Sequence, residues 1–328
     1  MFSQATQDSL IEEYDQVYRS LTKGWFCWNI TVLQYASVAA VEDSTGGSVV
    51  NSPGGESRVQ AIREVAQRLR ERVGWFGGIP SMTLHVSAVL LARQGVSADE
   101  FISELDEFKS NLGVRRWANP SDDWLTFMIL RYGGGGVVHR GGIPQSSWER
   151  FLSIKDEMAR PGTKEWSPEN GILSLCEGAP GDVVSASLDL HQRLLHGGFR
   201  PSNPLRTASR LLLLAGTRKC QALANFFQLA ENFHHRKLSI HSSHWVELAG
   251  LALCPERMAN VVDRVIELQS GLMELKPVVS QKTSVSLACQ LALTEYGRDP
   301  AANALIPNWK AVIMLLGVSN LLGQRRSF

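Results

Sequence analysis

Short apolar segments recur along this chain about every 40 residues, and each ends near a glycine or a cysteine. Within each segment the side chains are apolar on nearly every side, which is typical of a helix buried among its neighbours. The six segments are Ser81–Gly95, Ser121–Gly133, Ser167–Gly178, Asn203–Gly216, Ser242–Cys254 and Ser284–Gly297. Their spacing predicts a series of stacked α/α hairpins, with these helices as the buried member of each pair.

Longer helices with one polar face are predicted between the apolar segments. In the first of them, Phe101, Leu105 and Phe108 follow one another at steps of four and three residues, and most other positions are polar. This pattern indicates a helix with one face in water and one against the core. The polar helices are Asp99–Leu112, Ser147–Ala159, Arg218–His234 and Glu256–Leu275. Before the repeats, three more helices are predicted at Asp8–Leu21, Trp25–Ala40 and Arg58–Val73.

Buried helices that alternate with amphipathic ones predict an all-α fold in two layers. The chain would hold six α/α hairpins, or seven if Trp25–Ala40 is counted as an inner helix. Such hairpins either close into a ring, the α/α toroid, or continue as an open solenoid. We favour the closed toroid, because the apolar helices at the two chain ends can then cover each other. No domain boundary is predicted inside the repeats, so residues 1–328 form one domain.

The middle of the chain also resembles itself when it is shifted by 121 residues. Residues 77–130 then align with residues 198–251, with twelve identities in 54 positions and no gap. Average residue usage would give roughly three identities by chance. The matches include Gly95 with Gly216 and Trp124 with Trp245. We interpret the match as an internal duplication, although similar helices could also converge on similar residues.

Charge and composition exclude several classes of function. The chain has 33 basic and 32 acidic residues, a net charge of +1 and no basic stripe, which argues against nucleic acid as its main partner. The five cysteines lie far apart without a CxxC pair, so a zinc site or a disulfide framework is not expected. We therefore expect a soluble, cytoplasmic protein. The late apolar stretch Ala304–Gly323 contains Pro307 and Lys310, so a buried terminal helix is expected rather than a membrane span.

Polar and aromatic residues stand at the starts of the apolar helices. If all these helices start at one rim, the residues converge on a central cavity, which is the usual form of a small-molecule site. Trp124 and Trp245 would then face each other across its opening. The candidate substrate-binding residues are Trp124, Trp245, His85, Asn203, His241 and Lys282. In the alternative interpretation, Asn203 caps its helix, the tryptophans belong to the core and the charges are solvated.

Asp122 and Asp123 form the best acidic pair. Adjacent carboxylates beside an apolar pocket could hold Mg²⁺, or one of them could act as a general acid with a raised pKa. The alternative is that both acids complement the dipole at the start of a helix. No other cofactor and no other metal is expected.

His244 and Arg206 complete the candidate catalytic set. His244 could move protons, because histidine titrates near neutral pH. A metal site is not predicted there, because Glu247 does not converge with His241 and His244 on a helix. Arg206 lies two residues into an apolar helix, where it could bind a carboxylate or a diphosphate. It could equally pair with an acid on a neighbouring hairpin.

No strong catalytic motif is present. The glycine-rich run 133–142 lacks the Gly-Lys-Ser/Thr of a P-loop, and neither a nucleophile elbow nor an aspartate-rich DDxxD or DxDD box occurs. The segments Phe26–Ala40, Arg58–Gly78 and Gly197–Leu205 resemble an uncharacterised bacterial family of all-helical proteins of about 330 residues. The resemblance implies a helical fold and carries no catalytic residue. By analogy of architecture alone, isoprenoid cyclases and carbohydrate-active enzymes also use α/α toroids.

Two functions are therefore expected from the sequence. The first is a toroid enzyme that cyclises, isomerises or eliminates from a small, largely apolar substrate such as an isoprenoid, in an aromatic-lined central pocket. The alternative is a non-catalytic repeat module that binds a protein or peptide on its concave face. A closed interior with Asp123, Arg206 and His244 pointing inward would favour the enzyme, and a broad exposed apolar patch would favour the binding module.

Overall fold

The computed structural model describes residues 4–23, 30–41, 55–74, 78–112, 120–133, 143–159, 168–254, 256–275, 279–297 and 312–317. Throughout these ranges the chain is all-α, and successive helices contact each other in pairs. The pairs are α1 (Gln4–Thr22) with α2 (Ile30–Ala40), α3 (Gly55–Val73) with α4 (Ser81–Arg93), α5 (Ala98–Leu112) with α6 (Pro120–Gly133), α7 (Gln145–Met158) with α8 (Pro168–Ser174), α9 (Pro180–His196) with α10 (Asn203–Leu213), α11 (Lys219–His235) with α12 (Trp245–Ala252), and α13 (Met258–Glu274) with α14 (Gln281–Tyr296). Short 3₁₀ turns precede α11 and α12.

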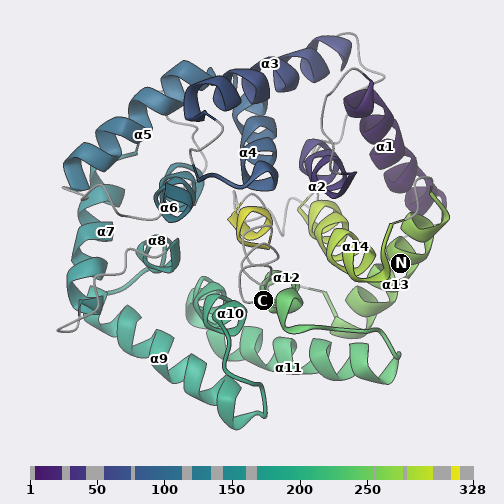
Figure 1. Cartoon of the computed structure of the whole chain (residues 1–328). Coiled ribbons are helices and arrows are strands. Elements are labelled where there is room, and N and C mark those ends of the chain that lie inside the picture. The colour runs from purple at the N-terminus through teal and green to yellow at the C-terminus, as the bar shows by residue number, and fades with distance from the viewer. Residues whose placement is uncertain are drawn as a thin grey trace.

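The helices form two layers. In Figure 1 the even-numbered helices lie inside and the odd-numbered helices lie outside them. The burial pattern agrees with this arrangement, because every residue of α14 from Ser284 to Tyr296 is buried. The outer helix α5 buries only one stripe, which contains Phe101, Leu105 and Phe108. The predicted alternation of buried and amphipathic helices is therefore confirmed.

Contacts also run from pair to pair within each layer. The inner helices α2 and α4, α6 and α8, α8 and α10, α10 and α12, and α12 and α14 are neighbours. The first and last pairs touch as well, through contacts of α1 with α13 and of α2 with α14. At Gly271 of α13, a Cβ atom would lie 3.1 Å from Cγ1 of Ile11, so the missing side chain lets α1 approach closely.

A helical segment at residues 312–317 lies in the middle of the inner layer (Figure 1). Its residues Val312 to Leu316 are buried, and Ile313 packs against Gly250 of α12. The buried terminal helix predicted for Ala304–Gly323 is confirmed over these residues, and the remainder of that stretch lies outside the described residues. None of the described helices is long and apolar enough to cross a membrane.

Long polar side chains of the outer helices donate hydrogen bonds to carbonyl groups at or just after the C-terminal ends of inner helices. Arg150 of α7 donates to the carbonyl oxygens of Ser174 at 3.0 Å and Gly178 at 2.8 Å, just beyond α8. Asn225 of α11 donates to the carbonyl oxygen of Ala252 at 3.0 Å, at the end of α12. These bonds satisfy carbonyl groups that have no partner inside their own helix. They fix the positions of the inner helices relative to the outer layer.

Helix α9 is absent from the predicted elements. Val183, Leu190 and Leu194 are buried along one face, but the fourth buried position of that stripe is Ser187. This small polar residue interrupts the hydrophobic period from which helices are recognised. The predicted cap at Asn203 is also shifted by one residue, because Ser202 accepts the Leu205 N–H at 3.2 Å.

One helix start repeats at the offset found in the sequence, because α5 begins at residue 98 and α11 at residue 219, a difference of 121. The starts of α4 and α10 differ by 122 and those of α6 and α12 by 125. Any series of hairpins of similar length would give a similar offset. The internal duplication therefore stays a prediction, and Gly77 at its edge lies outside the described residues.

Candidate functional site

The two tryptophans pack between the inner and outer layers. Trp124 is 1% exposed, donates its indole N–H to Oγ of Ser87 at 2.9 Å, and lies edge-on to Phe101 of α5 with ring centroids 4.7 Å apart. Trp245 lies edge-on to Phe199 at 5.0 Å and tilted against Phe226 of α11 at 6.0 Å. These contacts belong to the core, and they give no support to two indoles that face each other across an opening.

His244 is buried and its two ring nitrogens serve the backbone. Nδ1 accepts the N–H of His241 at 3.1 Å, which leaves the proton on Nε2 facing the carbonyl oxygen of Lys282 at 3.3 Å. Burial is the main reason that the pKa of His244 falls to about 4. The ring is therefore neutral near pH 7 and joins the starts of α12 and α14.

His85 has a comparable role between α3 and α4. Nδ1 donates to the carbonyl oxygen of Ser81 at 2.6 Å, and Nε2 lies 3.4 Å from Nη2 of Arg70. Burial is the main reason that the pKa of His85 falls to about 4, and the Arg70 charge acts in the same direction. A neutral imidazole with these partners stabilises the hairpin.

Asp123 is buried and Asp122 beside it is partly exposed. Burial raises the pKa of Asp123, and the positive charge of Lys109 on α5 acts in the opposite direction. Within the ranges that the structure describes, no group of three or more His, Cys, Asp or Glu residues could hold a metal ion. Magnesium binding at this pair stays a prediction that rests on two adjacent carboxyl groups.

The remaining candidates lie at the surface. Oδ1 of Asn203 accepts from Nη2 of Arg206 at 3.3 Å, and Nε2 of His241 lies 3.3 Å from Oγ of Ser239. Lys282 is exposed, and its carbonyl oxygen faces His244. None of these contacts brings the three side chains to a shared point.

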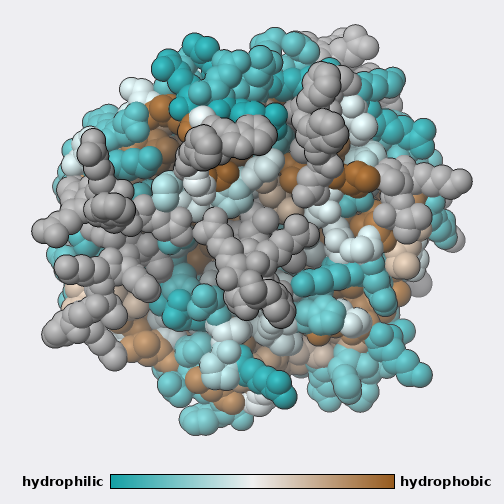
Figure 2. Space-filling view, in the orientation of Figure 1, coloured by the Kyte–Doolittle hydropathy of each residue, from teal (hydrophilic) through white to brown (hydrophobic). Residues whose placement is uncertain are grey.

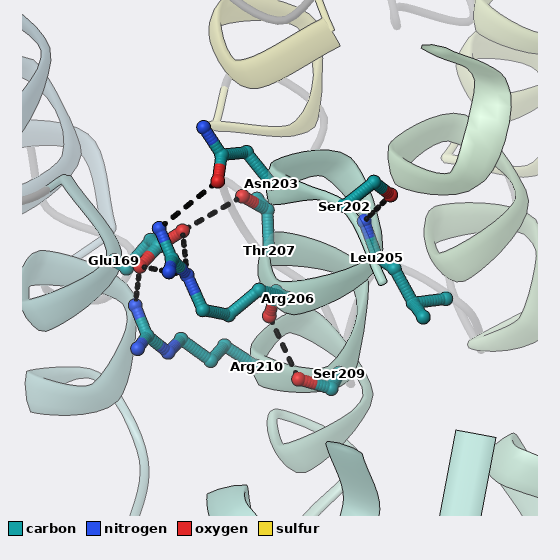
Figure 3. A network of polar contacts seen from close by, with 8 residues as sticks. All are labelled: Glu169, Ser202, Asn203, Leu205, Arg206, Thr207, Ser209 and Arg210. Carbon is teal, nitrogen blue, oxygen red and sulfur yellow. Dashed lines mark hydrogen bonds and ion pairs between the residues drawn. The ribbon is translucent and has the colours of Figure 1, made fainter. Parts of the chain in front are cut away.

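Arg206 takes the second of its two expected roles, because it pairs with Glu169 of α8. Its Nε lies 3.1 Å from both carboxylate oxygens (Figure 3). Arg210, one turn later on α10, donates to the same carboxylate, and the hydroxyl of Thr207 does so at 3.3 Å. The pair therefore belongs to a larger network between α8 and α10.

A different carboxyl group lies in the interior. Glu247 of α12 has no exposed surface, and its Oε1 accepts a hydrogen bond from Oγ of Ser286 on α14 at 2.5 Å. Burial raises the pKa of Glu247 from its ordinary value of 4.5 to about 7. The cause is that the ionised form loses its hydration in the core. At neutral pH this group is divided between its protonated and ionised forms.

Glu247 is accompanied by other buried polar groups. Its Oε2, the Gln290 amide and the Tyr35 hydroxyl make no well-formed hydrogen bond with the described residues. The Gln290 side chain nevertheless interacts with Glu247 and lowers its pKa, and Ser286 does the same for Tyr35. A Cβ atom at Gly317 would lie 2.9 Å from Oε1 of Glu247 and 3.1 Å from Nε2 of Gln290, so segment 312–317 packs against this polar cluster.

This interior cluster was not predicted from the sequence. Glu247 entered the sequence analysis only as an unsuitable partner for two histidines. A usable signal was present for Glu247, because it is the only charged residue in α12, which is otherwise apolar. Its meeting with Gln290, Tyr35 and Gly317 could not be predicted, since it depends on contacts between opposite ends of the chain.

A groove of about 560 Å³ lies elsewhere, between the outer helices α11 and α13 and the end of α12. Its lining is largely polar and includes Arg218, Asn225, Asn232, Glu256 and Arg257. None of the candidate residues predicted from the sequence lines it.

Comparison with known proteins assigns neither a family nor a function to this chain. No family model, no curated protein and no solved structure matches this chain. The resemblance to an uncharacterised bacterial family is therefore supported only in its coarsest form: the chain is an all-helical protein of 328 residues.

Proposed function

We propose that this chain is a closed α/α toroid enzyme that moves protons on a small, largely apolar molecule in its interior, with Glu247 as the acid and base. The observation that carries the proposal is a fully buried carboxyl group with a pKa of about 7 that shares the interior with the buried polar groups of Gln290 and Tyr35. A general acid or base works best when its pKa lies near the working pH. Strongly shifted pKa values are also concentrated at functional sites.

Closure of the toroid is supported by the contacts of α1 with α13 and of α2 with α14. An open solenoid would leave its first and last repeats with one free face each. In the closed form the cluster lies at the junction, because Tyr35 belongs to the first hairpin and Gln290 to the last. Closure therefore both removes water and completes the proposed site.

Each member of the cluster has a chemical role in this proposal. Ser286 holds Oε1 of Glu247, which leaves Oε2 to accept a proton from a substrate carbon and return it to another carbon. The amide of Gln290 and the hydroxyl of Tyr35 can donate to a substrate oxygen on which negative charge develops as the proton leaves carbon. Isomerisation and cyclisation of this kind need no further reactant. Segment 312–317 forms one wall, because Gly317 lies against Glu247.

The alternative of a peptide-binding module is less well supported. The large apolar side chains exposed in the described ranges are Ile30, Leu188 and Met273, on three different helices. On the face shown in Figure 2, hydrophobic surface is scattered among hydrophilic surface. Protein-binding surfaces usually present a contiguous apolar patch. The scattered pattern therefore favours the enzyme.

The proposal is tested by a thermal-shift screen of small apolar alcohols, aldehydes and alkenes, followed by incubation of each stabilising compound in D₂O. Wild-type protein should introduce deuterium at a substrate carbon and form a rearranged product, detected by mass spectrometry. Glu247→Gln should retain binding and lose about 100- to 10,000-fold in rate, the usual contribution of a general acid or base.

Asp123→Asn is the matched comparison, because it neutralises the other buried carboxyl group with a raised pKa. We expect its rate to stay close to wild type. Equal rates for Glu247→Gln and wild type would exclude the assignment, and a selective loss in Asp123→Asn would restore the acidic pair as the active group.

A further inference from the structure

The network between α8 and α10 carries more positive than negative charge. Glu169 supplies one carboxylate, and both of its oxygens are occupied by Arg206, Arg210 and Thr207. Among the described members of this network, two guanidinium groups therefore share one carboxylate, so positive charges outnumber negative charges by one. Arg210 alone already neutralises Glu169, so the ion pair does not require Arg206.

The two arginines are placed differently with respect to solvent. They lie one turn apart on the same face of α10, so their side chains run side by side towards Glu169 (Figure 3). Arg210 is 5% exposed, and its Nε has no hydrogen-bond partner in the described part of the chain. The side chain of Arg206 is 45% exposed. A buried, anchored guanidinium thus lies behind a second guanidinium that reaches solvent.

His191 of α9 responds to the charges of this network. Burial is the first cause that lowers the pKa of His191, the charges of Arg206 and Arg210 lower it further, and the charge of Glu169 acts in the opposite direction. Its Nδ1 is buried and forms no hydrogen bond with the residues that are described. The surplus of positive charge therefore reaches the neighbouring helix.

We infer that Arg206 and Arg210 form a binding site for the phosphate group of a small molecule. Guanidinium groups present paired donors that match phosphate oxygens. The described network has one positive charge in excess, which favours an anion, and a phosphate has enough oxygens to accept from both guanidinium groups at once. A carboxylate has only two oxygens and a smaller charge. This inference rests on the α8–α10 network alone and is independent of the role proposed for Glu247.

The test is calorimetric titration of inorganic phosphate into the full chain at constant ionic strength. We expect saturable binding to wild type and at least tenfold weaker binding to Arg206→Gln. Arg206→Lys should lie between them, because lysine keeps the charge but lacks the paired donors. Arg193→Gln is the matched control, since Arg193 is a surface arginine on α9 that pairs only with Asp189 among the described residues.

A second readout separates binding from folding. Phosphate should raise the unfolding midpoint of wild type and of Arg193→Gln, because a ligand of the native state stabilises it. It should leave the midpoint of Arg206→Gln unchanged, although that variant still unfolds cooperatively. Absence of saturable binding, equal affinity in Arg206→Gln and Arg193→Gln, or acetate binding as tight as phosphate would each overturn the inference.

Discussion

At the scale of the residue, burial sets the protonation of the interior. Glu247 has a raised pKa, whereas His85 and His244 have lowered ones, and desolvation is the largest cause in all three. The shifts have opposite signs because burial always favours the neutral form. Burial of Glu247 therefore lowers the free energy of unfolding as pH rises, and burial of His85 and His244 lowers it as pH falls.

The free energy of unfolding of Glu247→Gln should increase relative to that of wild type as pH rises. Below pH 4.5 the carboxyl group is protonated in both the folded and unfolded chains. Between pH 4.5 and about 7 the unfolded chain ionises while the native state keeps its proton, so wild type loses stability. The difference between Glu247→Gln and wild type should grow by on the order of 3 kcal/mol over this window. Urea unfolding at pH steps from 4 to 8 measures it, and a constant difference would contradict the raised pKa.

Replacement of His244 by glutamine should show the opposite dependence. The native pKa of His244 is about 4 and its ordinary value is 6.5, so the unfolded chain takes up a proton first as pH falls. The stabilising contribution of the neutral His244 ring is fully present above pH 6.5 and is lost as pH falls towards 4. The stability advantage of wild type over His244→Gln should therefore shrink by on the order of 3 kcal/mol on acidification. The same urea series tests this, and an advantage that grows in acid would exclude a neutral, buried imidazole.

At the scale of the element, three helices end in the same hydrogen-bonded turn with different residues in it. The N–H groups of Val96, Phe199 and Leu238 reach back to carbonyl oxygens five residues earlier. The residue before each of them has a positive φ, which is 67° at Gly95, 90° at Gly198 and 57° at Lys237. Glycine adopts this conformation without strain, whereas a side chain raises its energy. Helix α11 therefore ends less favourably than α4 and α9.

Lys237→Gly should stabilise the protein by about 0.5–1 kcal/mol, because it removes this backbone strain at an exposed position. Gly198→Ala is the converse experiment. A Cβ atom at Gly198 would meet no atom within 4 Å, so any loss reports the backbone conformation alone. We expect a loss of about 1–2 kcal/mol. Chemical denaturation measures both variants, and a destabilised Lys237→Gly would mean that its side chain makes a compensating contact.

At the scale of the whole molecule, the proposed closure makes the first and last hairpins neighbours. Ile11→Ala should then weaken α13 as well as α1, because Ile11 packs against Gly271. We expect a loss of about 1 kcal/mol for this partly buried side chain. Hydrogen exchange should show faster exchange in both helices. Faster exchange confined to α1 and its sequence neighbours would instead fit an open series of repeats, in which each unit stabilises only the next.

The sequence by itself determined the helices and their two layers. The spacing of hydrophobic residues depends only on neighbouring positions in the chain. It therefore identified α5 correctly as an outer helix, from the stripe through Phe101, Leu105 and Phe108, and α14 correctly as an inner helix, from its apolar run. The same dependence on period explains the omission of α9, where Ser187 occupies a core position. Nothing in these patterns distinguishes a side chain that points to the centre from one that points to the outer layer, so the sequence left both the pocket and the core interpretations of Trp124 and Trp245 open.

Only the tertiary structure decided which polar residues meet. The sequence left Arg206 two equal roles, anion binding or pairing with an acid on a neighbouring hairpin, and the packing of α8 beside α10 supplied Glu169, 37 residues away, as the acid. Glu247, Gln290 and Tyr35 come together because the last helices pack against the first. Convergence of this kind is set by helix packing over the whole chain, so a candidate site made of distant residues leaves no local pattern from which it could be predicted.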